Sequence, residues 1–294
     1  MRCNGLMAAL LLFGIGETVS AETILDTRVI ERTFGVTGYT REDVFRVSLP
    51  RADLSVSLDG LKLKPKFALK SWVAFKRHGD AVVAHGDLVL LEREVQPVIE
   101  RLHALSVTVL ALHNHLIGES PHVMYLHFWA EGTAEQISSR LADVLALTGT
   151  PLQKSSAAKD LMGSDALPTN RIESLLQMKG IYRDGVLTIS VPRMQAVTMN
   201  RVELPPEMGM ASTINFQAGQ NGKIAATGDF VLLANEVNPV ASALSRYGLH
   251  VTAIHNHLLG ASPDLYVLHF WGHNSEEAVT RGLKASLDAM QIKP

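Results

Sequence analysis

The order of apolar and polar positions changes period along the chain, and each period predicts a different element. Apolar and polar residues alternate over Val44–Leu49, which is the pattern of a strand with one buried face. Within 133–147 apolar residues recur three or four positions apart, at Ile137, Leu141 and Val144. This spacing is typical of a helix with one apolar face. The pattern therefore predicts a mixed fold of strands and helices.

The last five elements expected in the first half of the chain are, in order, a strand, a helix, two strands and a helix. Pro97 stands where the first turn of the middle helix is expected, a position at which its missing N–H costs nothing. We expect both helices to cover one face of a mostly antiparallel sheet. The expected helices are 27–34, 95–105 and 133–147, and the expected strands are 44–49, 54–58, 71–75, 81–91, 107–113 and 123–129.

The same pattern occurs a second time. The offset that takes His113 to His255 also takes Ser48-Leu49-Pro50-Arg51 to Ser190-Val191-Pro192-Arg193. This constant offset is lost only near 60–80 and 202–222, where we expect loops to differ. The sequence therefore predicts an α+β fold of two tandem repeats related by a pseudo-two-fold axis, at 22–150 and 166–294, with a linker at 151–165.

Residues 1–21 have the order of a secretory signal peptide. Arg2 supplies the positive start, Leu6–Ile15 the apolar segment, and Val19-Ser20-Ala21 a small-residue cleavage site. The only cysteine, Cys3, precedes the apolar segment, so the mature chain would contain no disulfide. We expect a protein exported to the periplasm or the extracellular space, with no stable membrane insertion after cleavage.

Composition narrows the partners. An apolar fraction of 47% is enough for a large core, and a net charge of -2 with scattered basic residues excludes nucleic acid as the expected partner. A cell-wall or small-molecule ligand remains compatible with the sequence. The oligomeric state is left open.

The duplicated stretch that bears the candidate chemistry is His-Asn-His followed by a third histidine. Side chains at alternate positions of a strand share one face, so two imidazoles can approach the same ion. Three converging imidazoles with one open position form a typical site for zinc or another divalent transition metal. The candidate metal ligands are His113, His115 and His127 in repeat 1 and His255, His257 and His269 in repeat 2.

Four acidic residues occur at matching positions near these histidines. A carboxylate there can act as a fourth ligand, as an orienting partner of an imidazole, or as a general base. The candidate catalytic residues are Asp87 and Glu94 in repeat 1 and Asp229 and Glu236 in repeat 2. Glu94 and Glu236 also stand near a helix start, where negative charge is favourable in any case.

Other duplicated residues favour structural roles. Trp129 and Trp271 are expected in the core, although an exposed tryptophan beside a polar pocket would suit stacking on a sugar ring. Arg51 and Arg193 can bind an anionic group, although a solvated arginine at a strand end is the more frequent case. No nucleophile elbow, zinc-protease helix motif, phosphate-binding loop or dinucleotide fingerprint is present.

The chain resembles the LppY/LpqO family of exported bacterial proteins, built on a domain of unknown function. The resemblance is carried by Gly228–Leu233, Glu236–Pro239 and Ala253–His257, through to His269-Phe270-Trp271, and by the equivalent run of repeat 1. It implies export but no settled reaction. The family's namesakes are lipoproteins, whereas this chain has no cysteine after the apolar segment.

Three interpretations follow from the sequence. The first is an exported binding protein with two histidine-rich pockets, one per repeat or one shared, for a transition metal or a cell-wall or carbohydrate ligand. The second is a metal-dependent hydrolase acting on a cell-wall or carbohydrate substrate. The third is a structural histidine network without a ligand. The sequence leaves open whether the protein is an enzyme.

Overall fold

The computed structural model describes residues 25–152 and 167–292. The expected signal peptide and most of the expected linker lie outside these residues. Within the described part, no helix is long and apolar enough to cross a membrane.

Each repeat contains one six-stranded antiparallel sheet, and the two sheets have the same strand order. In repeat 1 the order is β1-β2-β5-β6-β8-β7, and in repeat 2 it is β9-β10-β13-β14-β17-β15. The strands of repeat 1 are β1 (Tyr39–Arg41), β2 (Val44–Pro50), β5 (Lys70–His78), β6 (Ala81–Leu91), β7 (Thr108–His113) and β8 (Val123–Gly132). Those of repeat 2 are β9 (Ile181–Arg183), β10 (Val186–Pro192), β13 (Ala211–Ala218), β14 (Ile224–Leu232), β15 (His250–Asn256) and β17 (Tyr266–Asn274).

The helices cover the outer face of each sheet. Ile30, Val98 and Leu141 of the three helices of repeat 1 share one core with alternate residues of the sheet, such as Val73 and Leu88. The helices of repeat 1 are α1 (Thr27–Phe34), α3 (Glu92–Ala104) and α4 (Ala134–Leu145), and those of repeat 2 are α5 (Thr169–Leu176), α6 (Ala234–Arg246) and α7 (Glu276–Leu287). The sequence-based prediction of an α+β tandem repeat with helices on one sheet face is confirmed.

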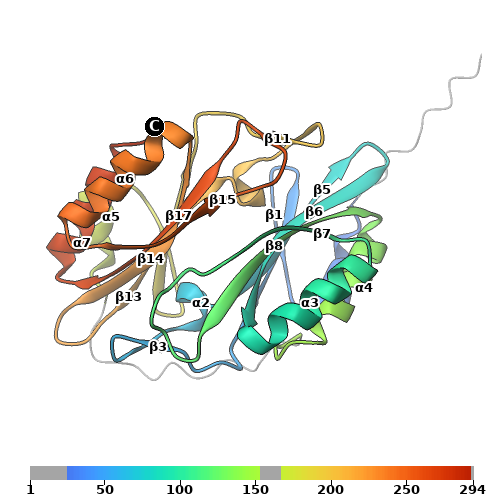
Figure 1. The fold of residues 1–294 in the computed structure, drawn as a ribbon, viewed down its shortest axis with the longest axis horizontal. Helices are drawn as coiled ribbons and strands as arrows, with labels where there is room; N and C mark the ends of the chain where they lie inside the picture. The colour runs from blue at the N-terminus through green and yellow to red at the C-terminus, as the bar shows by residue number, and fades with distance from the viewer. Residues whose placement is uncertain (1–24, 153–166, 293–294) are drawn as a thin grey trace, which may run out of the picture.

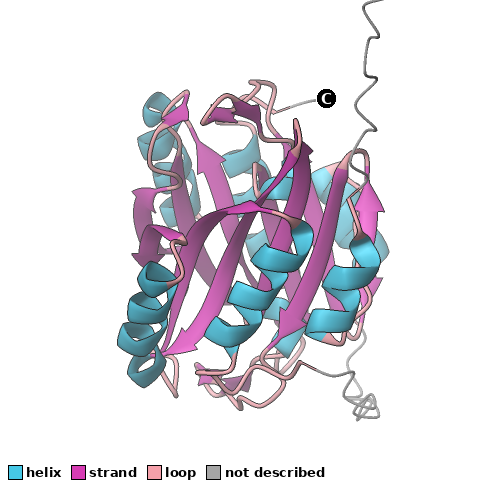
Figure 2. Cartoon of the chain, turned by 90° about the vertical axis from the view of Figure 1, so that its right-hand side faces the viewer, coloured by secondary structure: helices cyan, strands magenta, loops and turns pink. Residues whose placement is uncertain are grey.

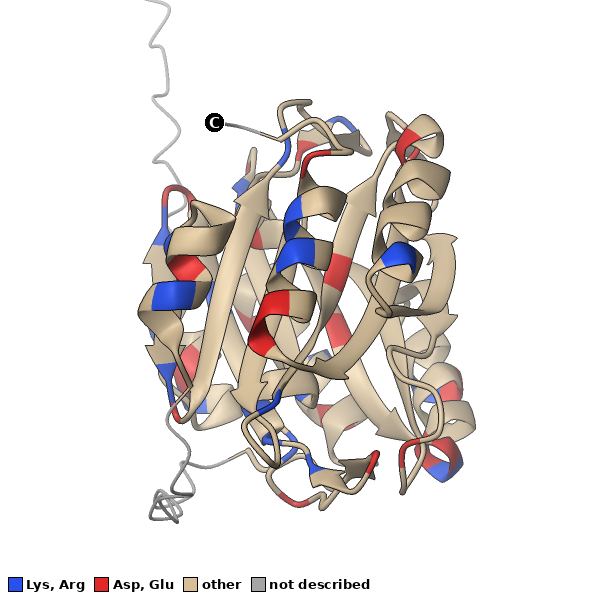
Figure 3. Ribbon diagram, turned by 90° about the vertical axis from the view of Figure 1, so that its left-hand side faces the viewer, with Lys and Arg blue, Asp and Glu red and all other residues tan. Residues whose placement is uncertain are grey.

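The two repeats meet through the inner faces of their sheets, so that helices lie on both flanks and strands between them (Figure 1). A side view also shows the helices outside the strands (Figure 2). The helices on the flank of the second repeat carry interspersed acidic and basic side chains (Figure 3). The inner faces are therefore removed from this charged surface.

The middle helix of each repeat begins earlier than the sequence predicts. α3 begins at Glu92, which makes Pro97 its sixth residue instead of a first-turn residue. The reason is a side-chain cap: Glu94 accepts a hydrogen bond from the backbone N–H of Leu91 at 2.9 Å and fixes the first turn there. The equivalent bond from Leu233 to Glu236 is 2.7 Å long.

The loss of the constant offset between the repeats has a simple cause. Val44 pairs with Lys76, and Val186, the equivalent of Val44, pairs with Gln217. The offset from Val44 to Val186 would instead place Ala218 opposite Val186, so the loop before this strand is shorter by one position in the second repeat. Separately, the strand expected at 54–58 is observed only as β3 (Ser57–Leu58), which pairs with β4 (Leu61–Lys62).

Each repeat sends a long loop across the inner sheet face of the other, and we call 51–69 and 193–210 the exchanged loops. The first contains β3, β4 and α2 (Pro65–Ala68), and it packs on the sheet of repeat 2 where Phe67 meets Trp271 edge to face at 6.1 Å. The second contains β11 (Thr198–Met199), β12 (Val202–Glu203) and η1 (Pro206–Met208), and it packs around Trp72 and Trp129 of repeat 1. β11 also pairs with β16 (Ala261–Ser262). The exchanged loops thus cover the inner-face tryptophans of both sheets.

Candidate metal centre

All six sequence-predicted histidines meet in one place between the two sheets. The ring centroids of His113 and His255 are 3.8 Å apart, and those of His115 and His269 are also 3.8 Å apart, although each pair joins different repeats. His127 stacks on His113 at 4.9 Å. We call these six histidines with Asp87 and Asp229 the histidine centre.

Strand register brings the side chains of the first repeat together. His127 on β8 pairs directly with Asp87 on β6, so both side chains project from the inner face. His113 ends β7, and His115 follows just past the strand with its Nε2 3.1 Å from the Nε2 of His113. The strand thus stops before His115 and does not carry both residues on one face as expected, but the two imidazoles are in contact.

Strand pairing in the second repeat is equivalent, but one histidine has a different contact. His269 pairs with Asp229, and its Nε2 lies 2.9 Å from the Nε2 of His255. His257 instead places its Nε2 2.8 Å from the carbonyl oxygen of Gly209 in an exchanged loop. The two halves of the centre are therefore not equivalent.

Reciprocal hydrogen bonds hold the two His-Asn-His segments against each other. The Asn114 amide donates to the carbonyl of Thr252 at 3.1 Å, and the Asn256 amide donates to the carbonyl of Leu110 at 3.3 Å. The Thr252 hydroxyl donates to the carbonyl of His115 at 2.6 Å. The asparagines thus fix the position of the histidines across the repeat boundary.

The two aspartates differ in solvent access. Asp87 has a side chain 6% exposed, and its Oδ1 has no hydrogen-bond partner among the described residues. Asp229 has a side chain 33% exposed, although its Oδ1, 2.8 Å from Nδ1 of His269, is buried as well and also lacks a hydrogen bond within the described part of the chain. Of the two aspartates of the histidine centre, Asp229 is therefore the one that solvent reaches.

The buried imidazoles are held in their neutral form. Burial lowers the pKa of His255 to about 3 and that of His257 to about 4, and the neighbouring His269 adds to the effect in both. The pKa values of His115 and His127 lie well below the ordinary range, because burial and then the adjacent imidazoles disfavour a positive charge. Neutral imidazoles are the form that binds metals.

Burial has the opposite effect on Asp87. It raises the pKa of this carboxyl well above its usual range, and the nearby Asp229 raises it further. A divalent cation would offset the repulsion between the two carboxylates and displace the proton of Asp87, because its positive charge stabilises their ionised forms. A bound cation would therefore stabilise the two close carboxylates in their ionised forms.

Two sets of ligand atoms are close enough to share an ion. Within the described residues, His113, His115 and His269 form one set and Asp87, His113 and His127 the other, with ligand atoms no more than 4.8 Å apart in each. Two nitrogens bound to one ion at zinc distances lie roughly 3.0–3.4 Å from each other. The 3.1 Å and 2.9 Å separations of the two Nε2 pairs are close to that spacing.

Glu94 and Glu236 have other partners. The guanidinium of Arg51 binds Glu94 at 2.8 Å and Asp53 at 2.9 Å, and Arg193 binds Glu236 at 2.8 Å. Arg51 and Arg193 are 0% and 3% exposed, so the expectation of solvated strand-end arginines is wrong. The anion that these arginines bind is a carboxylate of their own repeat, and the arrangement favours a structural role for all four.

Sequence reasoning missed His85 and Tyr125 at the centre. His85 is fully buried and stacks on His127 at 5.4 Å, with its Nδ1 2.7 Å from the carbonyl of Met208. Tyr125 stacks on His115 at 3.5 Å. The matching positions in the second repeat are Thr227 and Val267, so a search restricted to duplicated residues omits both. The spacing of His85 and Asp87 on one strand was the available signal.

The expectation that the paired tryptophans belong to the core is supported. Trp129 and Trp271 are 4% and 5% exposed. The indole N–H of Trp271 donates to Asp59 of an exchanged loop at 2.7 Å. Neither ring is open for stacking on a sugar.

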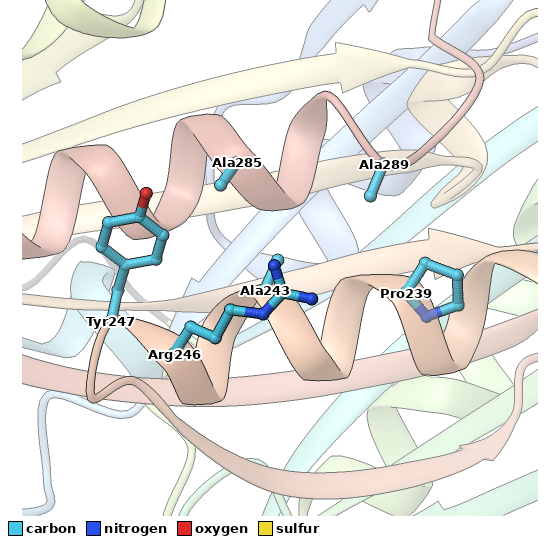
Figure 4. Close-up of a pocket in the computed structure, with 6 residues that line it drawn as sticks. All are labelled: Pro239, Ala243, Arg246, Tyr247, Ala285 and Ala289. Carbon is cyan, nitrogen blue, oxygen red and sulfur yellow. The ribbon is translucent and has the colours of Figure 1, made fainter.

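A surface groove of about 580 Å³ lies away from the histidine centre, between α6 and α7 (Figure 4). It is lined mainly by small residues, with Arg246 and Tyr247 at one end. The equivalents of its Ala243 and Ala285 in repeat 1 are Arg101 and Asp143, which form an ion pair at 3.0 Å. The groove thus marks a local difference between the repeats.

The fold and centre define a class: tandem α+β repeats that place a shared histidine cluster between two sheets. A protein-family model described as Domain of Unknown Function (DUF1259) matches residues 28–147 and again 170–289. The chain therefore belongs to this family and contains two copies of its domain.

Other comparisons add little. No curated protein matches the chain. Among solved structures, a crystal structure of a trimeric bacterial microcompartment shell protein, PduB, is similar at 11% identity over 84% of this chain and 87% of that one. The TM-score is 0.20, too low to support an inference about fold or function.

Proposed function

We propose that this protein binds a divalent transition metal ion, such as zinc, in a single histidine centre shared by its two repeats. The observation that carries the proposal is the convergence of six imidazoles and two carboxylates from both repeats. A buried cluster of this kind is costly without a ligand, because several polar atoms lack partners. Nδ1 of His113 and Oδ1 of Asp87 are two of them.

His113 provides the sharpest test, because it belongs to both ligand sets. We expect the purified chain, dialysed against zinc, to retain metal in elemental analysis, and His113→Ala to lose nearly all of it. His103→Ala on the exposed face of α3 is the matched control and should retain it. Absence of metal from the unaltered chain under replete conditions would refute the proposal.

A purely structural network predicts a different result. In that case His113→Ala would lower the free energy of unfolding by about 1–3 kcal/mol, as loss of a buried hydrogen-bonding group does, while no variant changed metal content. Urea unfolding of the same proteins with and without zinc separates the two. Metal binding predicts that zinc stabilises the unaltered chain and not His113→Ala.

A metal-dependent hydrolase is the second candidate, supported by the exposure of Asp229. This carboxylate reaches solvent beside His269 and could serve as a general base toward a bound water. The substrate class is a cell-wall fragment or another carbohydrate. Turnover of such fragments that disappears with chelator and in Asp229→Asn would establish the hydrolase. Binding of the fragments without turnover would contradict the hydrolase and support a binding protein.

We also propose that the chain is exported, because residues 1–21 have the order of a signal peptide. Intact mass of the protein recovered from the extracellular or periplasmic fraction should correspond to a chain beginning at residue 22. Recovery of the full-length chain in the cytoplasm alone would contradict export.

A further inference from the structure

Two cationic side chains lie on the inner face of the repeat 1 sheet without an acidic partner. Arg46 on β2 and Lys70 on β5 are both half-buried. Within 25–152 and 167–292, no carboxylate oxygen lies within 4.0 Å of a nitrogen of either side chain. By contrast, Lys66 and Lys76, on α2 and β5, pair with Asp184 and Asp43.

The position of Arg46 is fixed by neutral contacts. Its Nη1 donates to the backbone carbonyl of Glu207 at 2.8 Å, and its guanidinium carbon lies 3.9 Å from the centre of the Trp72 ring. These contacts orient the group without neutralising it. Its charge is therefore available to an anion.

Both cations act electrostatically on the histidine centre. Trp72 pairs with Asp87 across β5 and β6, and Lys70 precedes Trp72 by two positions on the same strand, so both face inward. The charge of Asp229 acts on Lys70, and those of Glu207, Asp229 and Asp87, in that order, act on Arg46. Asp229, the more exposed aspartate of the centre, therefore acts on both cations.

Burial makes these charges costly. It lowers the pKa of Lys70 to about 8, and the positive charge of Arg46 lowers it further. It also lowers the pKa of Arg46. An anion bound between the two would offset this cost.

The second repeat shows that the fold does not require the cations. Arg46 pairs with Ala74 as Thr188 pairs with Asn215, and Pro50 pairs with Lys70 as Pro192 pairs with Ala211. The equivalents of Arg46 and Lys70 are thus Thr188 and Ala211. The histidines and aspartates of the centre occur in both repeats, whereas the cations occur in repeat 1 alone.

We propose that Arg46 and Lys70 bind an oxyanion group, phosphate or carboxylate, of a ligand that reaches the histidine centre from the Asp229 side. The inference rests on the proposed function, because a metal ion would neutralise Asp87 and Asp229 and leave the two cations free for the ligand. Arg46 supplies planar N–H donors and Lys70 a point charge, a combination suited to an oxyanion.

The test uses the full chain loaded with zinc, titrated calorimetrically with inorganic phosphate and in parallel with acetate. Arg46→Thr and Lys70→Ala introduce the residues that the second repeat carries at these positions, so both variants should fold. We expect each to weaken oxyanion binding about tenfold or more, as loss of a charge-assisted hydrogen bond does, with metal content unchanged. Lys76→Ala, on the same strand but paired with Asp43, is the control and should bind as the unaltered chain does.

The outcomes separate the two proposals. Binding of one anion alone identifies phosphate or carboxylate as the group recognised. If the metal-loaded chain binds no anion, or if both variants bind anions as tightly as the unaltered chain does, the oxyanion site is overturned. Neither result contradicts the metal centre. If the chain takes up no metal, the metal centre fails. The same titration is then carried out with the metal-free chain. Loss of anion binding in the two variants supports the oxyanion site, and unchanged binding contradicts it.

Discussion

At the scale of single residues, the buried ion pair of Arg51 and Glu94 shows how one carboxylate can serve several partners. Glu94 accepts hydrogen bonds from Arg51, from the backbone of Leu91 and from the backbone of Gly149. Burial alone would raise the pKa of Glu94, but these bonds together lower it. The pair therefore ties the end of β2, the start of α3 and the residues after α4 together.

Removing one member of this pair should be costly. We expect Arg51→Met to lower the free energy of unfolding by about 3–5 kcal/mol, because it leaves a buried carboxylate without its counter-charge. Arg101→Met, which breaks the exposed pair with Asp143, should cost less than about 1 kcal/mol. Urea unfolding at neutral pH measures both, and equal losses would contradict a special role for the buried pair.

The same pair predicts a pH dependence. The folded-state pKa of Glu94 is lower than its ordinary value of 4.5, so its contribution is fully present above that value. It is lost as the pH falls through the lowered folded-state pKa, because protonation abolishes the ion pair. The stability difference between the unaltered chain and Arg51→Met should therefore shrink as the pH is lowered below about 4.5. A difference that is constant from pH 7 to pH 3 would contradict this.

The residues of the histidine centre were largely predictable, because duplication identifies six histidines and two aspartates. Their convergence into one place was not, since it depends on how the inner faces of the two sheets meet. Glu94 and Glu236 were grouped with them because nothing in the sequence indicated that these carboxylates form ion pairs with Arg51 and Arg193. Residues found in only one repeat, such as His85, were missed because the comparison of the repeats selects only residues found in both.

At the scale of elements, periodicity predicted most helices and strands, and the β-α-β-β-α order of β6, α3, β7, β8 and α4 agrees with it. The start of α3 was misplaced because Pro97 is a strong first-turn signal, whereas the local cap of the Leu91 N–H by Glu94 was not recognised. The short strands of the exchanged loops carry little periodicity of their own. Packing against the other repeat determines them.

Close packing of strands explains the glycine before each aspartate of the centre. A Cβ on Gly228 would lie 1.9 Å from the backbone oxygen of Thr213 on the adjacent strand. We expect Gly228→Ala to separate β14 from β13, to cost about 1–3 kcal/mol, and to weaken zinc binding by displacing Asp229. Ser190→Ala, at an exposed position of β10, should stay within about 0.5 kcal/mol. Thermal unfolding and zinc titration measure the two effects, and an unchanged zinc affinity would contradict the second.

At the scale of the whole molecule, the exchanged loops make each repeat part of the other's core. Phe67 is fully buried against Trp271, although the two belong to different repeats. We expect Phe67→Ala to cost about 3–5 kcal/mol and to lower the stability of both repeats together, in one calorimetric transition. Two separate transitions, with only one of the repeats affected, would show that the repeats unfold independently.

The arrangement of the histidine centre across the repeat boundary has a consequence for how such a protein can diversify. A chain with one repeat could complete the centre only by self-association, and a symmetric homodimer must carry the same residue on both sides of its axis. Covalent fusion removes that restriction. The sheet of repeat 1 can then carry Arg46 and Lys70 at the positions where that of repeat 2 carries Thr188 and Ala211, so the two halves of one site can take on different roles.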